Sequence, residues 1–470
     1  MIRVRSSFQG QRHHRAELDK QNLSRTNRMR RETPPAFGGG RAEVRPSGGL
    51  GIECGRDGDS SLPRHGSNSC GLPVSGTVPA QSVILIRMNL VIDGLIYTKE
   101  AHGGISRLFS EILPRMCDLD PSLTVALFTE KGCPLQPLPT HPQIAHRSVP
   151  RLDSYLRPRR VWKDVGAKAE QVLRRCCIGS GRSALWHSTF YTLPHKWNGS
   201  QVVTFHDLGF QRLPQLFNQP YHEMHRQRMR RCLVEADVVI TISKATSEDI
   251  QDYYGIDGKK IRVTPLACST SFRVLESGAL PRPVVTERPF ILYVGHRMCY
   301  KNFDTLLEAY AGWKLRKELD LVVVGGTSLS TQEQQMLVKL GVADQVHSAG
   351  HLDDGTLAQF YNQAAAFVCP SLYEGFGIPL LEAMACGCPV VSSRIPACLE
   401  VAGDCGVYFD PKSTDDLQRA LDIAVGEGRK SSRITKGLEK AREYSWDRTA
   451  QQTLDVYREA IGCVKHGGRN

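Results

Sequence analysis

Glu374 and Glu382, which stand eight residues apart in this 470-residue chain, are the side chains whose types and spacing most directly suggest chemistry. Glu374 precedes two glycines, Gly375 and Gly377, and Pro379 suits the first turn of a helix that would carry Glu382. Glycines let a backbone approach a ligand closely, and the free N–H groups at a helix start bind anions. Because a carboxylate repels phosphate but accepts well from sugar hydroxyls, two carboxylates beside an anion site predict a nucleotide-sugar ligand.

The sequence around the two glutamates decides between this hypothesis and the alternative that both are ordinary residues without a role in ligand binding. Taken alone, Glu374 is equally explained as a solvated loop residue, and Glu382 as an acidic residue that the helix dipole favours. However, E-G-F-G-I-P-L-L-E-A-M-A-C-G-C-P-V-V, residues 374–391, resembles the signature of the group 1 retaining glycosyltransferases, which have the GT-B architecture. The resemblance implies that Glu374 contacts the transferred sugar and that Glu382 holds the ribose hydroxyls. The donor-binding residues that it implies in this segment are Gly375, Phe376, Gly377, Ile378 and Glu382.

Further matches to this family follow in order from Met88 to about residue 460. Residues 91–94, V-I-D-G, and residues 103–107, G-G-I-S-R, predict a strand, a Gly-rich loop and a helix that begins near Ser106. Gly103 and Gly104 are expected to face a diphosphate, although a glycine pair by itself usually marks a turn.

His206 follows the apolar strand expected at residues 201–205. A lone histidine is more often a structural residue, but the carboxyl end of a buried strand is where open α/β sheets bind ligands. The resemblance implies that His206 lies at the sugar and acceptor site.

Two cations follow a second buried strand, F-I-L-Y-V at residues 290–294. Gly295 ends this strand and is also expected among the donor-binding residues. Arg297 would bind a phosphate bidentately and Lys301 would bind it as a point charge. Many relatives carry an arginine directly before the lysine, whereas this chain has Tyr300 there, so Arg297 is assigned from a different pattern than Lys301.

Composition and length predict a two-domain globular enzyme. The chain has 41% hydrophobic and 23% charged residues, and its length exceeds what one core usually serves. Its 15 cysteines lack zinc spacing and fit a reducing cytosol. The acidic pair Asp353-Asp354 is expected to be a loop and helix cap, so no metal site is predicted.

Residues 1–87 differ from the rest of the chain. They are rich in Pro, Gly, Ser and Arg without apolar periodicity, which predicts a disordered basic extension. Through residue 82, thirteen Lys or Arg stand against seven Asp or Glu, so this segment contributes half of the formal net charge of +12. A solvated extension is favoured over nucleic-acid binding, and translation from Met88 stays an alternative.

No stretch is apolar enough to span a membrane, so a cytoplasmic enzyme is expected. Residues 155–175 mix basic and apolar side chains, so they could lie on an anionic membrane surface or form the solvated face of a domain helix. The same ambiguity applies to a second cluster, which comprises Arg226, Arg228, Arg230 and Arg231.

Alternating strands and helices predict two doubly wound parallel-sheet domains that face a cleft, an α/β fold of GT-B type. The expected parts are an acceptor-side domain at residues 88–280, a nucleotide-sugar domain at 281–444 and a helix at 445–470 that packs back on the first domain.

The expected function is transfer of a hexosyl unit, with mannosyl as one candidate, from a nucleoside-diphosphate sugar to a hydroxyl of a glycan or lipid-linked acceptor, with retention and without a cofactor. Arg297 and Lys301 would stabilise the leaving diphosphate, while His206 and Glu374 would position the sugar. Two alternatives stay open. A nucleotide-sugar epimerase would convert the donor without an acceptor, and a non-catalytic scaffold would tend to have lost the charged site residues, which are all present here.

Overall fold

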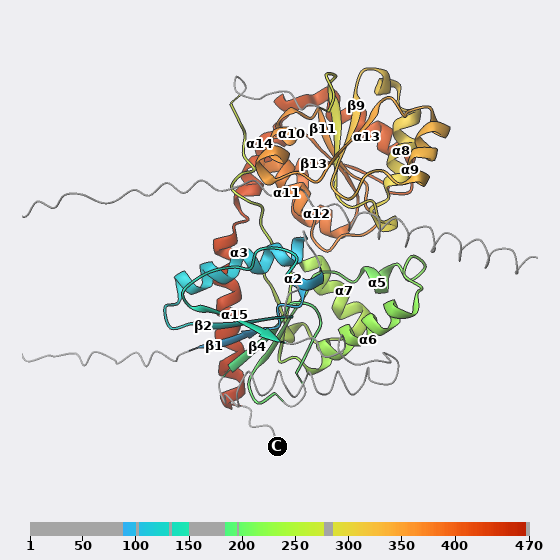
Figure 1. Cartoon of the computed structure of the whole chain (residues 1–470). Coiled ribbons are helices and arrows are strands. Elements are labelled where there is room, and N and C mark those ends of the chain that lie inside the picture. The colour runs from blue at the N-terminus through green and yellow to red at the C-terminus, as the bar shows by residue number, and fades with distance from the viewer. Residues whose placement is uncertain are drawn as a thin grey trace, which may run out of the picture. The chain divides into compact units, whose positions relative to one another are not determined.

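A computed structural model describes residues 88–99, 103–130, 134–149, 184–194, 197–276 and 285–466, all within one compact unit of the chain (Figure 1). The predictions for the extension at residues 1–87 and for the basic stretch at residues 155–175 lie outside these residues.

Seven parallel strands form a first sheet within the described residues, in the order β3-β2-β1-β4-β5-β6-β7. The runs Ala184–Ser188 and Gln201–Phe205 are buried at every position, because helices cover both faces of a parallel sheet. The strands are β1 (Asn89–Ile92), β2 (Thr124–Glu130), β3 (Ile144–Val149), β4 (Ala184–Ser188), β5 (Gln201–Phe205), β6 (Val238–Thr241) and β7 (Ile261–Val263).

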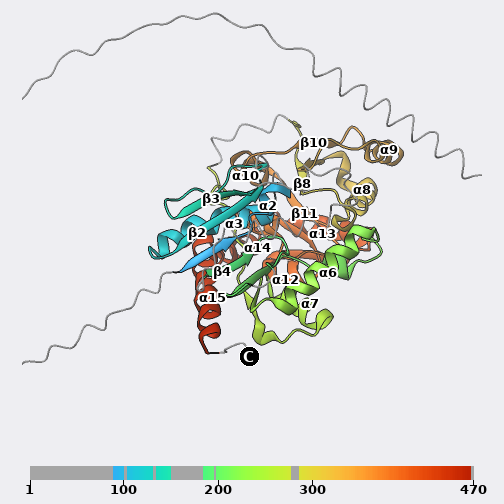
Figure 2. The ribbon, with the colours of Figure 1, turned by 60° about the horizontal axis from the view of Figure 1, so that its bottom comes forward.

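The helices of this part sort onto the two faces of the first sheet. Side chains of α3 share one core with the sheet, and side chains of α6 and α7 share another. Figure 2 shows α6 and α7 next to each other and α3 apart from them. The helices are α2 (Ile96–Lys99), α3 (Gly104–Leu119), α5 (Gly209–Arg212), α6 (Pro220–Glu235) and α7 (Lys244–Tyr254). We call this sheet with its helices the first lobe.

Six parallel strands form a second sheet, again within the described residues, in the order β10-β9-β8-β11-β12-β13. The strands are β8 (Phe290–Val294), β9 (Asp320–Val324), β10 (Val346–Gly350), β11 (Ala366–Cys369), β12 (Val390–Ser393) and β13 (Gly406–Phe409). The longer helices are α8 (Phe303–Gly312), α9 (Thr331–Leu340), α10 (Asp354–Gln363), α11 (Ile378–Ala385), α12 (Pro396–Ala402), α13 (Thr414–Glu427) and α14 (Ser432–Arg442).

We call the second sheet with its helices the second lobe, and helices cover both faces of this sheet as well. Side chains of α8, α9 and α13 pack into one core, and side chains of α10, α11 and α14 pack into the other. Two parallel sheets layered between helices confirm the predicted α/β class. In each sheet the strand order reverses, between β1 and β4 and between β8 and β11, and such switch points are where open α/β sheets bind ligands.

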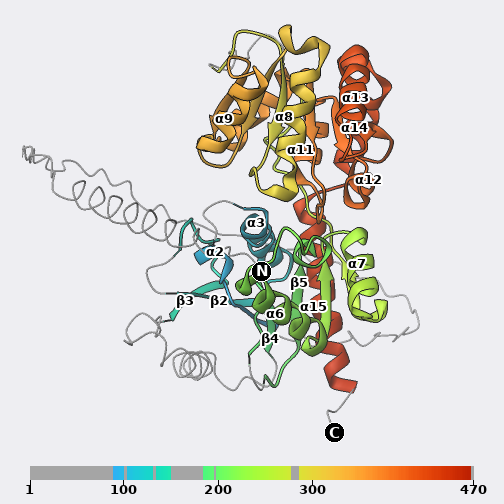
Figure 3. The same ribbon diagram turned by 90° about the vertical axis from the view of Figure 1, so that its right-hand side faces the viewer.

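The last helix, α15 (Trp446–His466), returns to the first lobe (Figure 3). The hydroxyl of Tyr457 lies 2.5 Å from Nδ1 of His187 on β4, and Ser200 Oγ donates to the carbonyl of Ala460 over 2.9 Å. The strands of the two sheets fall within residues 88–280 and 281–444, while the exact domain bounds stay a prediction.

Candidate active site

The centre of the candidate site is an ion pair between Lys301 and Glu374, at the β8–β11 switch point. Lys301 lies in the turn after β8, and its Nζ is 2.7 Å from Oε1 and 2.8 Å from Oε2 of Glu374. Ser371, which follows β11, donates a third hydrogen bond of 2.7 Å to Oε1. The fold therefore brings the two predicted residues Lys301 and Glu374 together, and Ser371 helps to fix the carboxylate of Glu374.

The ion pair keeps the partly buried Lys301 charged. Burial acts to lower the pKa of Lys301, but the Glu374 carboxylate outweighs it, so the pKa lies above its usual value. The side chains of Lys301 and Glu374 are 22% and 12% exposed, so most of the surface of this ion pair is withdrawn from solvent. A permanently charged ammonium with limited solvation suits binding of a phosphate.

The Gly-rich loop after Glu374 is pressed against the end of β5. A Cβ on Gly375 would lie 1.8 Å from the backbone oxygen of His206, a distance that no side chain tolerates. The carbonyl of Gly375 accepts from Ser243 Oγ over 2.6 Å and from Thr246 Oγ1 over 3.2 Å. Hydroxyls at the start of α7 therefore hold the second lobe's loop beside His206 of the first lobe.

His206 is neutral, and one nitrogen of its ring makes no hydrogen bond within the described residues. Its side chain is buried, and burial lowers its pKa to about 3. Within the part of the chain that the structure describes, Nε2 is buried without a hydrogen-bond partner. Since buried polar atoms are normally satisfied, this nitrogen is an unused hydrogen-bonding group beside the glycine loop.

Glu382 lies one turn into α11 and is 5% exposed. Tyr361 donates to its Oε2 over 3.0 Å, and Arg107 Nη1 of the first lobe lies 3.8 Å from its Oε1. Burial raises the pKa of Glu382 to about 7, with Arg107 acting in the opposite direction. The carboxyl is therefore a strong acceptor whose charge depends on its neighbours.

The remaining donor-site residues lie around these carboxylates. Gly103 is the N-cap residue of α3, which begins at Gly104, two residues before the predicted Ser106. A Cβ at Gly104 would meet Ile378 Cδ1 at 3.4 Å, so the Gly-rich loop of the first lobe lies against the start of α11. Gly295 directly follows β8, and Gly377 is the N-cap residue of α11. The ring of Phe376 lies in the core against Tyr444.

Arg297 differs from the expectation. Its Nε lies 2.6 Å from Glu333 Oε1, and its two terminal nitrogens donate to the carbonyls of Gly325, Thr327 and Ser328 over 2.6–3.2 Å. Four hydrogen bonds use most of the five N–H groups of a guanidinium, and the side chain is 6% exposed. In this structure Arg297 holds the loop after β9, and its contact with a diphosphate stays a prediction.

Sequence reasoning did not assign a role to Arg107 and Tyr373, which the structure places in the site. Arg107 forms an ion pair with Asp354 of the second lobe. The hydroxyl of Tyr373 accepts from the backbone of Leu208 over 3.0 Å and donates to Asp249 over 2.7 Å. Arg107 stands inside a quoted motif and Tyr373 directly before another, but a motif does not reveal partners that are more than 100 residues away.

The acidic pair Asp353-Asp354 is a helix cap and a cross-lobe partner. Asp353 accepts from the backbone of Thr356 over 3.0 Å as the N-cap of α10, and Asp354 pairs with Arg107. Among the described residues, no group of three or more His, Cys, Asp or Glu could hold a metal ion.

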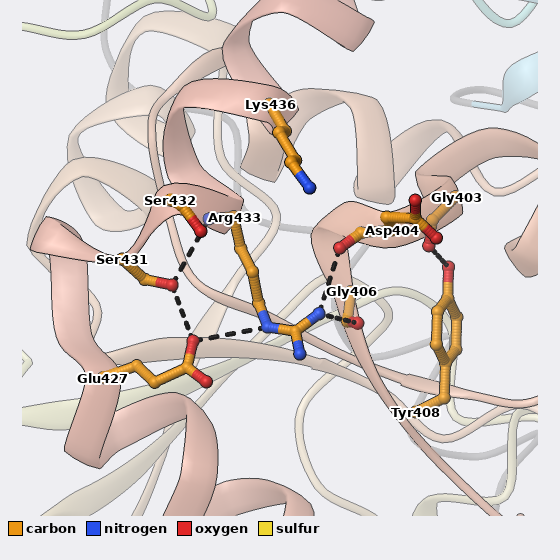
Figure 4. A pocket seen from close by; sticks show the side chains of 9 residues that line it. All are labelled: Gly403, Asp404, Gly406, Tyr408, Glu427, Ser431, Ser432, Arg433 and Lys436. Carbon is orange, nitrogen blue, oxygen red and sulfur yellow. Dashed lines mark hydrogen bonds and ion pairs between the residues drawn. The ribbon is translucent and has the colours of Figure 1, made fainter.

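A polar cavity of about 490 Å³ lies elsewhere in the second lobe (Figure 4). Glu427 accepts there from Ser431 Oγ over 2.6 Å and lies 3.3 Å from Arg433. None of the predicted site residues lines this cavity. Its lining consists of Gly403, Asp404, Gly406, Tyr408, Glu427, Ser431, Ser432, Arg433 and Lys436.

Comparison with known proteins gives the family. Residues 281–441 match the model of "Glycosyl transferases group 1", and residues 102–272 match "Glycosyltransferase Family 4". The chain is 30% identical over 288 residues to O-antigen chain mannosyltransferase B of Escherichia coli. The matched region covers 58% of this chain and 74% of that protein. This chain belongs to the group 1 glycosyltransferases.

Other relatives agree with this glycosyltransferase assignment. The MMP alpha-(1->4)-mannosyltransferase of Mycolicibacterium hassiacum is 30% identical over 48% of this chain and 55% of its own length. Sucrose-phosphate synthase from Thermosynechococcus elongatus superposes with a TM-score of 0.65 at 21% identity, over 80% of this chain and all of that chain. Anabaena HepE in complex with UDP and glucose gives 0.59 at 15% identity, over 79% of this chain and all of that chain. These structures confirm the GT-B fold of the glycosyltransferase.

Among the described helices of the glycosyltransferase, none is long and apolar enough to cross a membrane.

Proposed function

We propose that this glycosyltransferase moves a hexosyl unit from a nucleoside-diphosphate sugar to a hydroxyl of a glycan or lipid-linked acceptor, with retention and without a metal. One observation carries the proposal: the Lys301–Glu374 ion pair and the orphaned ring nitrogen of His206 flank a glycine loop at the start of α11. A cation for phosphate and acceptors for sugar hydroxyls thus lie within one site.

Lys301 would stabilise the charge that develops on the departing diphosphate. In the structure its ammonium is balanced by Glu374, so a phosphate that enters would share the cation with this carboxylate. The N–H groups at the start of α11 add a partial positive charge, as helix starts do.

Glu374 and His206 would position the transferred sugar. Glu374 is held by Ser371 and Lys301, so its oxygens stay in place as acceptors for hydroxyls. His206 is neutral, which favours a hydrogen bond over proton transfer from a charged ring. We therefore assign no protein nucleophile, and the leaving phosphate would take the proton of the acceptor hydroxyl.

The relatives support the choice of donor and acceptor. Two of them are mannosyltransferases by name, one of O-antigen chains, and HepE has been crystallised with UDP and glucose. A mannosyl donor and a polysaccharide acceptor are the corresponding proposals for this chain.

The test is a panel of UDP- and GDP-sugars, with GDP-mannose and UDP-glucose included, each incubated with the full chain with and without glycan acceptors. We expect acceptor-dependent release of nucleoside diphosphate from one donor, and a product whose anomeric configuration by NMR equals that of the donor. Conversion of the donor sugar without an acceptor would identify an epimerase instead, and an inverted product would refute retention.

We also propose peripheral attachment of a cytoplasmic enzyme to an anionic membrane that presents a lipid-linked acceptor. On α6, Arg226 bonds to Glu223 and to two backbone carbonyls, whereas Arg228, Arg230 and Arg231 are exposed. Sedimentation with phosphatidylglycerol vesicles would test this. Charge reversal at Arg157, Arg159 and Arg160 is expected to weaken binding, and unchanged binding would contradict the role of residues 155–175.

A further inference from the structure

Arg107 reaches from the first lobe to two acidic residues of the second lobe. It lies in the first turn of α3 and forms an ion pair with Asp354 at the start of α10. Its other terminal nitrogen, Nη1, lies 3.8 Å from Oε1 of Glu382 on α11. The arginine side chain is 25% exposed, so this contact is screened much less than an ion pair at the surface.

The carboxyl of Glu382 depends on this arginine for its charge. The titratable and charged groups that act on it come from α3, from α10, from the segment after β7 and from the end of α11. Within this set, Arg107 is the cation and each other group is neutral or acidic. The other groups are Asp354, Tyr361, Cys268 and Cys386.

The geometry points to Arg107 as a positioning residue for the donor, which keeps Glu382 ionised and oriented to accept the ribose hydroxyls from across the lobes. This inference rests on the proposed function, because it takes Glu382 as the ribose acceptor. Asp354 holds the guanidinium in place, so that it faces Glu382 without filling the site.

Distances explain how the carboxylate stays available. At 3.8 Å the Arg107–Glu382 contact is an ion pair and too long for a hydrogen bond, so it leaves the lone pairs of Oε1 free. Tyr361 occupies one site on Oε2. A protonated carboxyl would lose acceptor capacity and place a hydrogen where a ribose hydroxyl needs a lone pair. Because burial already raises the pKa of Glu382 to about 7, loss of Arg107 would leave the carboxyl largely protonated at neutral pH.

The experiment is calorimetric titration of the full-length protein with UDP and with GDP between pH 6 and pH 9. For the nucleotide that binds, we expect the affinity of the wild type to fall below about pH 7. Arg107→Met should move this fall upward by about one pH unit, which corresponds to roughly a threefold loss of affinity near pH 7.5 that is regained at pH 9. Arg107→Lys, which keeps the charge, should restore most of the affinity at pH 7.5.

Two controls separate this effect from others. Arg115→Met removes another arginine of α3, which bonds to Glu111 and Asp447, and should leave the pH profile unchanged. The phosphates of the nucleotide titrate equally with each variant, so the difference between profiles reports on the protein. Thermal unfolding of each variant verifies that it is folded.

An equal loss of affinity at every pH in Arg107→Met would overturn the inference, because it would indicate direct ligand binding or a structural defect. Glu382→Ala separates this failure from failure of the proposed function. If Glu382→Ala binds nucleotide as well as the wild type, the ribose role itself is wrong. If it binds more weakly and adding Arg107→Met causes no further loss, the inference is supported, whereas additive losses would refute it.

Discussion

At the scale of single residues, the two glutamates of the site differ in what their surroundings make of the same side chain. The Glu374 carboxylate accepts hydrogen bonds from an ammonium group and a hydroxyl group. The Glu382 carboxyl is buried, accepts from a tyrosine hydroxyl and has an arginine at a longer distance. Equal substitutions at the two positions should therefore have unequal effects.

Glu382→Ala should weaken binding of the nucleoside diphosphate by about 1.5–3 kcal/mol, the range for hydrogen bonds to charged groups. Glu374→Ala should instead reduce turnover more than nucleotide binding, because we propose the transferred sugar as its partner. Calorimetry with UDP and GDP, together with kcat from product formation, would separate the two roles. Equal losses of affinity in both variants would contradict them.

Lys301→Ala should lower kcat by about 10²–10³-fold, since it removes stabilisation that grows as the phosphate leaves. Lys314→Ala is a matched control, because Lys314 is 72% exposed and pairs with Asp422 at the surface. Addition of EDTA should change the rate of the wild type little. Loss of activity with EDTA and its return with Mg²⁺ or Mn²⁺ would show that the metal-free mechanism is wrong.

Arg297→Met tests which of two roles this residue has. Its four hydrogen bonds to Glu333 and to the loop after β9 predict a lower melting temperature, with nucleotide affinity affected through the loop. A fall in kcat comparable to that of Lys301→Ala, with an unchanged melting temperature, would instead support the diphosphate contact expected from the sequence.

At the scale of elements, much of the site could be predicted because chemistry follows strand ends. The apolar runs before Gly295 and His206 form β8 and β5 at the expected residues, and Pro379 lies in the first turn of α11. The local pattern did not show the partners of Arg297 and Arg107, because carbonyl groups after β9 and an acidic residue on α10 become neighbours only through tertiary packing. Motif spacing predicts which element carries a side chain, but not what the opposite lobe presents to it.

The docking of α15 onto the first lobe should be sensitive to acid. His187 bonds to Tyr457 through Nδ1 and to Thr204 through Nε2, and burial lowers its pKa to about 3. In the unfolded chain the imidazole titrates near pH 6.5, so below that pH the unfolded state takes up a proton that the folded state refuses. The free energy of unfolding should fall by about 1 kcal/mol per pH unit for this residue.

Urea unfolding at pH 7.5, 6.5 and 5.5 would measure this slope. His187→Gln keeps a polar side chain without the titration and should flatten the dependence by the contribution of one histidine, while buried His206 still contributes its own. An identical slope in this variant would exclude His187 as a source of the acid sensitivity.

At the scale of the whole molecule, the two lobes touch through hydrogen bonds as well as through apolar side chains. Glu400 on α12 accepts from the backbone N–H groups of Lys244 and Ala245, both over 2.9 Å, at the start of α7. Tyr373, directly before Glu374, bonds to Leu208 and Asp249 of the first lobe. The register between the lobes is thus set by groups next to the reacting centre.

Tyr373→Phe removes the hydroxyl that joins Glu374's loop to the first lobe. We expect kcat to fall by about tenfold, because small misplacements of a reacting group are costly, while nucleotide affinity stays near that of the wild type. Tyr253→Phe, on an exposed side chain of α7, is the control. A parallel loss of affinity and kcat would indicate general damage to the second lobe rather than misalignment.

The contact between Gly375 and the His206 carbonyl also limits how this enzyme can be recombined. A loop that carries the donor-binding glycines fits only against a partner that offers a flat backbone edge and two hydroxyls, which here are those of Ser243 and Thr246. The lobes are therefore not interchangeable cassettes. A chimera that takes its second lobe from a relative will be active only if it keeps or restores these contacts of Gly375 with His206, Ser243 and Thr246. This requirement holds whichever sugar the new lobe binds.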